Sequence, residues 1–252
     1  MGVINQNLSI VTCSKADEIG LTKTLDSLEL LKSDLPQIIL VLSEYSSLQI
    51  EKLRDKYLNL KPRILQVDAE GIYAAQNQGM QVASSEFTLI LNGGDCIASE
   101  SALRDLLLNT EKSQWGYGSI EVVDSLSGAK RIYEFKNYSL TLHRLGLKFV
   151  PHPAVIVRTK IAQQIGGFDE KLLVAADQKM LLNFASKHKP VITKGVISIF
   201  YRGGASSRTP EDIVSDFSAI SRELFGYFFH SRLIDVVIWK IVLVLRRFKA
   251  SN

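Results

Sequence analysis

The 252-residue chain is predicted to have an α/β fold with a mostly parallel central sheet flanked by helices. In its first half, short apolar runs alternate with segments whose apolar residues recur at helical spacing, which is typical of parallel βαβ units. Hydrophobic residues make up 46% and charged residues 22% of the chain, so a globular core is expected. We also expect a small antiparallel element and a C-terminal amphipathic helix.

The first half supplies strands and helices in turn. Short apolar runs predict strands at 8–13, 38–42, 63–67 and 87–92. Helices are predicted at 19–31, 47–57, 72–84 and 99–109, the last opened by Ser99 or Ser101. This alternation predicts parallel strands covered by helices on both faces.

The second half has a different character. Two apolar runs separated by the turn SGAK predict an antiparallel hairpin. A further strand, a loop with a helix, and one or two strands follow at 151–158, 166–188 and 191–202. Trp115 and Tyr117 are expected in the core and not as a sugar platform, whereas His143 and His188 are assigned to the surface. We therefore place one domain at 1–209 and a helical segment at 210–252.

Residues 231–249, in the C-terminal segment, are apolar nearly all round. At about 100° per residue, the charged side chains of this helix fall within about half of its circumference: Arg232, Asp235, Lys240, Arg246 and Arg247. Such a helix either packs into a core or a dimer, or lies in a membrane interface with basic residues reaching lipid phosphates. The basic cluster at the end favours the membrane, although it also suits a helix C-terminus. We predict membrane association for 210–252.

Composition narrows the possible partners and the compartment. A net charge of +4 is mild and does not indicate nucleic acid. The N-terminus has no basic region and reads as a first strand, not a signal peptide. No segment reaches the ~18 apolar residues that span a bilayer. Cys13 and Cys96 end apolar runs and are expected to be buried in a reducing compartment rather than joined in a disulfide.

The stretch NGGD, Asn92–Asp95, follows the fourth predicted strand. Open α/β sheets bind ligands at the carboxyl ends of their strands. Gly93 and Gly94 permit close approach of a ligand to the backbone, and Asp95 offers a carboxylate oxygen to a divalent cation. Mg²⁺ needs few protein carboxylates when a substrate diphosphate supplies the other oxygens. The stretch therefore suits a nucleoside-diphosphate site, although NGGD is also an ordinary turn.

Asp177, in AADQKMLLNF, stands at the start of a predicted helix. It is either an N-cap or a catalytic carboxylate held on a rigid element. His152 precedes Pro153, so its backbone is expected to be extended. Its side chain is predicted to line or pack the site, with acceptor, metal or diphosphate binding as alternatives.

Four segments in order resemble the family 2 glycosyltransferases, inverting enzymes with the GT-A fold. They are LSIVTCSK with LTKTLDSL, GIYAAQNQGM with SSEFTLILNGGD, HPAVIVR with IGGFDEKLLVAADQKMLL, and YRGGASS. The match covers about residues 7–208. It is most similar to the branch associated with bacterial exopolysaccharide and O-antigen assembly.

This resemblance implies roles for particular residues. Asp95 falls on the aspartate that binds Mg²⁺ or Mn²⁺, and Asn92 and Gly94 fall where other members often have acidic residues. Asp177 falls on the general base. The helix that lines the nucleotide-sugar pocket carries two of the matching residues: Tyr73 and Asn77.

Two further positions follow from the resemblance. Arg202 and the glycines at 203–204 fall in a loop expected to approach the diphosphate or the acceptor. The family's second strand usually ends in an aspartate that contacts the uracil or ribose. This chain reads ILVLSEYSS there, so either Ser43 or Glu44 takes that place.

Inverting glycosyl transfer is a direct displacement that needs one base and a charge-absorbing metal. We therefore predict an enzyme that moves a sugar from a nucleotide sugar, with a UDP-sugar favoured. The expected acceptor is a lipid-linked or growing glycan in bacterial surface polysaccharide synthesis, at the inner face of the cytoplasmic membrane. The alternative is an inactive GT-A-like scaffold subunit, because the second-strand aspartate is missing. A nucleotidyltransferase is disfavoured, because TCSKADEIG has a single lysine and a single glycine.

Overall fold

The computed structural model describes residues 3–68, 71–172, 174–202 and 209–251. Its strands are β1 (Leu8–Lys15), β2 (Gln37–Ser43), β3 (Arg63–Gln66), β4 (Phe87–Ile90), β5 (Cys96–Ile97), β6 (Trp115–Asp124), β7 (Lys130–Tyr133), β8 (Val155–Arg158) and β9 (Val191–Arg202). Its α-helices are α1 (Val3–Asn7), α2 (Glu18–Leu28), α3 (Ser47–Lys56), α4 (Ile72–Val82), α5 (Glu100–Thr110), α6 (Leu140–Arg144), α7 (Thr159–Gln164), α8 (Ala176–Lys187), α9 (Pro210–Phe225) and α10 (Arg232–Ser251).

The strands form one mixed sheet in the order β3-β2-β1-β4-β8-β6-β9-β5, with β7 paired to β6. The block β3-β2-β1-β4 is parallel throughout. Its central strands are apolar and buried on both faces, which is why their sequences do not alternate. The predicted α/β class and the parallel first half are confirmed. The carboxyl ends of these strands therefore meet at one edge of the sheet.

The second half of the chain adds the antiparallel pairs. β8 runs antiparallel to both β4 and β6, and the predicted hairpin is formed by β6 and β7. The segment 191–202 is a single strand, parallel to β6 along most of its length.

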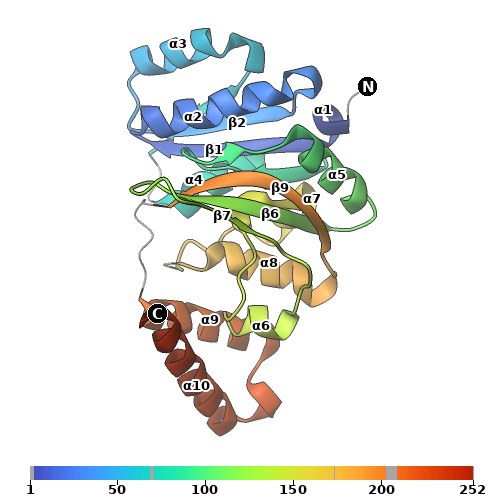
Figure 1. Cartoon of the computed structure of the whole chain (residues 1–252), viewed down its shortest axis with the longest axis vertical. Coiled ribbons are helices and arrows are strands. Elements are labelled where there is room, and N and C mark those ends of the chain that lie inside the picture. The colour runs from blue at the N-terminus through green and yellow to red at the C-terminus, as the bar shows by residue number, and fades with distance from the viewer. Residues whose placement is uncertain (1–2, 69–70, 173, 203–208, 252) are drawn as a thin grey trace.

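Helices cover both faces of the sheet, with α2 and α3 on one side and α4 and α8 on the other (Figure 1). Core residues of α5 join the first side and those of α7 the second. Trp115 and Tyr117 are fully buried in the second cluster, so the prediction that they belong to the core is confirmed.

The short elements were not predicted, and one surface assignment was wrong. α1, α6 and α7 have five or six residues each, too few to show a helical period. His143 lies on α6, and its side chain is buried rather than at the surface, because α6 packs against α8 and α9.

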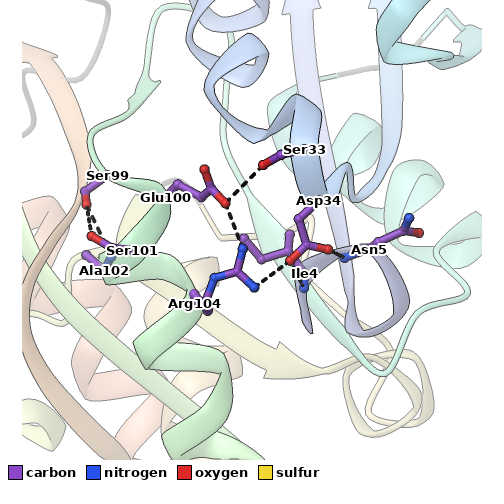
Figure 2. A network of polar contacts seen from close by, with 9 residues as sticks. All are labelled: Ile4, Asn5, Ser33, Asp34, Ser99, Glu100, Ser101, Ala102 and Arg104. Carbon is purple, nitrogen blue, oxygen red and sulfur yellow. Dashed lines mark hydrogen bonds and ion pairs between the residues drawn. The ribbon is translucent and has the colours of Figure 1, made fainter. Parts of the chain in front are cut away.

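A polar network ties α1 and α5 to the turn that follows α2 (Figure 2). The buried carboxylate of Asp34 accepts hydrogen bonds from the backbone amides of Ile4 and Asn5, both at 2.9 Å. It also pairs with Arg104, which reaches Glu100 as well. Burial alone would raise the pKa of Asp34, but these hydrogen bonds and the Arg104 charge hold it below its ordinary value.

Helix α9 packs on α8, and α10 packs on α9, through a third apolar cluster that includes Phe217 and Trp239. α10 turns its charged residues Asp235 and Arg246 toward the domain. Asp235 is buried and pairs with Arg222 at 2.8 Å, while the Arg246 guanidinium lies over the Phe149 ring. The two residues therefore face the protein, so Arg246 does not take the position toward lipid phosphates that was expected of the basic residues.

The outward face of α10 is apolar. Its exposed side chains recur every three or four positions: Leu233, Val237, Ile241, Val244 and Phe248. Within the described part of the chain, no helix combines the length and the apolar character needed to cross a bilayer.

Candidate active site

The NGGD turn is fastened to β1 and α2 by its backbone. The Gly93 amide donates to the Cys13 carbonyl at 2.9 Å, and the Gly94 amide donates to Thr24 Oγ1 at 2.9 Å. Gly94 has a φ of +101°, which favours glycine. A Cβ on Gly93 would lie only 3.2 Å from atoms of Ser14. Both glycines are therefore explained by local geometry, and Gly94 leaves open space where a side chain would stand.

Asp95 is 7% exposed at the end of this turn. Burial raises the pKa of its carboxyl to about 7, although a hydrogen bond from the Tyr201 backbone and the charge of Lys23 act in the opposite direction. The Lys23 ammonium lies 2.8 Å from the centre of the Tyr201 ring. Sequence reasoning missed Lys23, because nothing in α2 distinguishes it from other surface lysines.

A metal at this turn would take few ligands from the protein. Among the described residues, no group of three or more His, Cys, Asp or Glu side chains could hold a metal ion. Asp95 is a buried carboxylate, and burial raises its pKa. This donor set fits a Mg²⁺ or Mn²⁺ ion that binds one carboxylate and takes its other oxygens from a substrate diphosphate.

Helix α4 connects the NGGD turn to the loop before α8. At one point Gln76 Nε2 donates to Asn92 Oδ1 at 3.0 Å. At another, the Asn77 side chain pairs with both the amide and the carbonyl of Phe168. The Tyr73 hydroxyl donates to the Val174 carbonyl at 2.7 Å. One helix therefore positions both halves of the predicted site.

The polar groups of Tyr73 and Asn77 thus hold the backbone of Val174 and of Phe168. Tyr73 also stacks on Phe168, with ring centroids 6.0 Å apart. Gly167 is required beside Asn77, since a Cβ there would lie 2.3 Å from Asn77 Oδ1. Nucleotide-sugar contact by these two residues stays a prediction.

Asp177 lies in the first turn of α8 and is not its N-cap, which is Ala175. The free amides of Val174 and Ala175 are instead satisfied by Asp216 of α9, at 2.9 and 3.1 Å. Asp177 is half-buried, and its Oδ2 accepts a hydrogen bond from Gln178 Nε2 at 2.8 Å. With the capping alternative removed, its carboxylate is available for chemistry.

His152 stands beside Asp177 and packs edge-on against Phe168, with ring centroids 5.5 Å apart. Burial lowers the pKa of His152, and the charge of Asp177 acts in the opposite direction. The imidazole is therefore neutral near pH 7. This arrangement agrees with the predicted packing role, but the expected extended backbone was wrong, because His152 begins a short 3-10 helix, His152–Ala154.

The remaining predicted positions lie at strand ends. Arg202 ends β9 with an exposed side chain, opposite Asp124 of β6. The glycines at 203–204 lie outside the described residues. Ser43 is buried at the end of β2, whereas Glu44 has a φ of +58° and pairs with Lys15 at 3.0 Å.

Sequence comparison links the chain to glycosyltransferases. No protein-family model matches it. Two Mycobacterium tuberculosis proteins, from strains CDC 1551 and H37Rv, are each described as an uncharacterized glycosyltransferase. Each is 28% identical over 152 residues. The match covers 58% of this chain and 56% of each relative, so it spans little more than half of their length.

Structural comparison gives similar folds over most of the chain. S. aureus TarS residues 1–349 in complex with UDP-GlcNAc aligns with a TM-score of 0.70 and 19% identity, covering 94% of this chain and 71% of that one. The mannosyltransferase PcManGT from Pyrobaculum calidifontis, in complex with GDP-Man and Mn²⁺, aligns with a TM-score of 0.63 and 11% identity, covering 87% and 65%. The fold is that of these GT-A-like structures, and the glycosyltransferase relatives support the prediction of a transferase enzyme.

Proposed function

We propose that the chain is an inverting family 2 glycosyltransferase that moves a sugar from a UDP-sugar to a lipid-linked or growing glycan acceptor. Its expected setting is bacterial surface polysaccharide synthesis of the exopolysaccharide and O-antigen kind, at the inner face of the cytoplasmic membrane. Support comes from the ordered motifs, from the glycosyltransferase relatives and from the similar fold of TarS in complexes with UDP-GlcNAc and UDP.

The observation that carries this proposal is the double attachment of helix α4. Through Gln76 it holds the NGGD turn, and through Tyr73 and Asn77 it holds the loop that leads to Asp177. Asp95 is suited to bind a metal ion with a diphosphate, and Asp177 is suited to accept a proton. The segments that carry both carboxylates are thereby tied to one rigid helix.

Transfer follows as one displacement. The acceptor hydroxyl oxygen forms a bond to the anomeric carbon while the bond from that carbon to the diphosphate oxygen breaks. The electron pair of the broken bond leaves with the nucleoside diphosphate, and the hydroxyl proton passes to Asp177. A single base suffices, because the diphosphate is already a good leaving group and needs no proton donor.

Asp95 would hold the divalent metal ion, together with oxygens of the diphosphate. A bound Mg²⁺ or Mn²⁺ supplies electrostatic stabilisation of the negative charge on the leaving group. Arg202, and Lys23 beside Asp95, are cationic side chains near the same strand ends. The open space beside Gly94, which has no side chain, permits the diphosphate to approach the NGGD backbone closely.

Nucleotide binding tests the donor half of this proposal. We would measure UDP, GDP and dTDP binding by calorimetry, with and without Mn²⁺. Metal-dependent UDP binding is expected in the wild type, with a loss of at least tenfold in Asp95→Ala. Asp55→Ala, a removal of an exposed aspartate on α3, is the matched control. If the wild type binds none of the three nucleotides, the donor assignment is refuted.

Transfer itself separates the enzyme from an inactive scaffold. Asp177→Asn keeps the shape of the side chain but removes the base, so nucleotide binding should persist while sugar transfer falls at least a hundredfold. The departure at Ser43 and Glu44 motivates the scaffold alternative. That alternative predicts no transfer by the wild type and no loss of biological function in Asp177→Asn.

The outward face of α10 supports a membrane-bound acceptor. It presents an apolar stripe, and exposed basic residues, Lys240 and Arg247, lie on the same helix. An amphipathic helix of this composition suits an anionic lipid surface. The opposite face is anchored to the domain by Trp239 and Asp235, so the protein would dock as one body.

Vesicle binding tests the membrane half separately. Val237→Glu with Ile241→Glu changes two side chains that are already about half exposed, so the fold should be retained. Flotation with phosphatidylethanolamine and phosphatidylglycerol vesicles should show at least a tenfold loss. Leu126→Glu, at an exposed leucine of the β6–β7 turn, is the control and should bind normally. Equal binding by all three proteins would refute the membrane assignment.

A further inference from the structure

A chain of hydrogen bonds runs from the protein interior to Asp177. The Tyr138 hydroxyl lies 2.9 Å from His143 Nδ1, and His143 Nε2 lies 2.9 Å from Gln178 Oε1. Gln178 Nε2 then lies 2.8 Å from Asp177 Oδ2. His143 and Gln178 are 1% and 4% exposed, so water does not compete for these contacts.

The backbone of Val150 fixes the direction of this chain. The Val150 amide can only donate, and it contacts Gln178 Oε1 at 3.1 Å. The Val150 carbonyl can only accept, and it contacts Gln178 Nε2 at 3.1 Å. The amide of Gln178 therefore has a single orientation, in which Oε1 faces His143 and Nε2 faces Asp177.

This orientation determines the tautomer of His143. Because Gln178 Oε1 can only accept, His143 must donate through Nε2, and its Nδ1 must accept from the Tyr138 hydroxyl. Burial lowers the pKa of His143 to about 4, although the Gln178 contact acts in the opposite direction. The ring is thus neutral at pH 7 with its one proton on Nε2.

We infer that Gln178 is a positioning residue, which holds Oδ2 of Asp177 so that Oδ1 faces the acceptor hydroxyl and takes its proton. This rests on the proposed function. Asp216 fixes the backbone before Asp177, whereas Gln178 fixes the carboxylate itself. Free rotation of the carboxylate would misalign it, and a displacement of 1 Å can cost about a hundredfold in rate.

Two substitutions remove the donor in different ways. Gln178→Met removes every polar contact, whereas Gln178→Glu keeps the acceptor for His143 but replaces the donor with an oxygen. Both should bind UDP within twofold of wild type and lose at least tenfold in kcat at about pH 7.5. The Gln178→Glu variant should regain activity as the pH falls, because the protonated form of the introduced carboxyl can donate a hydrogen bond to Asp177. The titratable side chains in this hydrogen-bond chain are Asp177, His143 and Tyr138, and His152 lies beside Asp177.

The control is Gln163→Glu on α7, where the amide donates to the carbonyls of Met80 and Ala83. It should affect stability but produce no recovery at low pH. Unchanged kcat in Gln178→Met, or a loss in Gln178→Glu that is the same at every pH, would overturn the inference.

Nitrogen NMR of the wild-type chain gives a readout that does not depend on transfer. His143 should show a protonated Nε2 and an unprotonated Nδ1 at about pH 7. The opposite tautomer would overturn the inference. If the wild type neither binds nucleotide nor transfers sugar, the proposed function is refuted. The His143 tautomer then still tests whether the hydrogen-bond chain exists.

Discussion

Burial of His143 should make the protein lose stability in mildly acidic solution. The pKa of this ring falls from its ordinary 6.5 to about 4 in the folded protein. Between these values the unfolded chain binds a proton that the folded chain does not, so the free energy of unfolding decreases as the pH falls. Each pH unit is worth about 1.4 kcal/mol, so the gap corresponds to about 3 kcal/mol, of which about 2.5 is lost by pH ~4.5.

Urea unfolding of wild type and His143→Gln between about pH 7.5 and about pH 4.5 measures this effect. Asp95 works in the opposite direction, because its raised pKa stabilises the folded state as the pH falls. His152, with a lowered pKa, works in the same direction as His143. The difference between wild type and variant cancels both contributions.

The variant should therefore lose less stability than wild type over this range, by about 2–3 kcal/mol. The surface substitution His230→Gln is the control and should keep the wild-type slope. Equal slopes for wild type and His143→Gln would refute the reasoning, as would an NMR titration of the His143 ring with a midpoint near 6.5.

Three further tests, two of them with a control variant, probe the fold and the strand-end turn. Asp34→Ala should lower the free energy of unfolding by about 2–4 kcal/mol, because two backbone amides and an arginine lose their partner, whereas Glu100→Ala should cost less than about 1 kcal/mol; urea denaturation measures both. Gly94→Ala and Gly128→Ala should each cost about 1–2 kcal/mol, because both positions have a positive φ, but calorimetry should show weaker UDP binding only in Gly94→Ala. Gly79→Ala should cost about 1–3 kcal/mol in thermal unfolding, because the new Cβ would lie 2.2 Å from a valine of β1, and an unchanged melting temperature would contradict that close packing.

The sequence pointed to several residues of the candidate site but to few of the contacts that hold them in place. Asp95 and Asp177 stand at a strand end and a helix start, positions that local patterns reveal. Lys23 and Asp216 were missed because their partners lie far away in the chain. Gln178 was missed because Val150 and His143, which contact its side-chain amide, lie earlier in the chain. Asp216, for example, caps amides about forty residues earlier, and no local pattern signals such a pairing.

The sequence by itself determined the parallel half of the fold. The apolar runs of β1 and β2 can be satisfied only by burial on both faces, and the intervening helices follow from their spacing. For α10, the sequence established a helix with unequal faces, but only the tertiary structure decided which face points outward. Asp235 faces inward because its charge is paired with Arg222, and a paired charge can be buried. The apolar stripe on the other face of α10 therefore stays exposed and available to another surface.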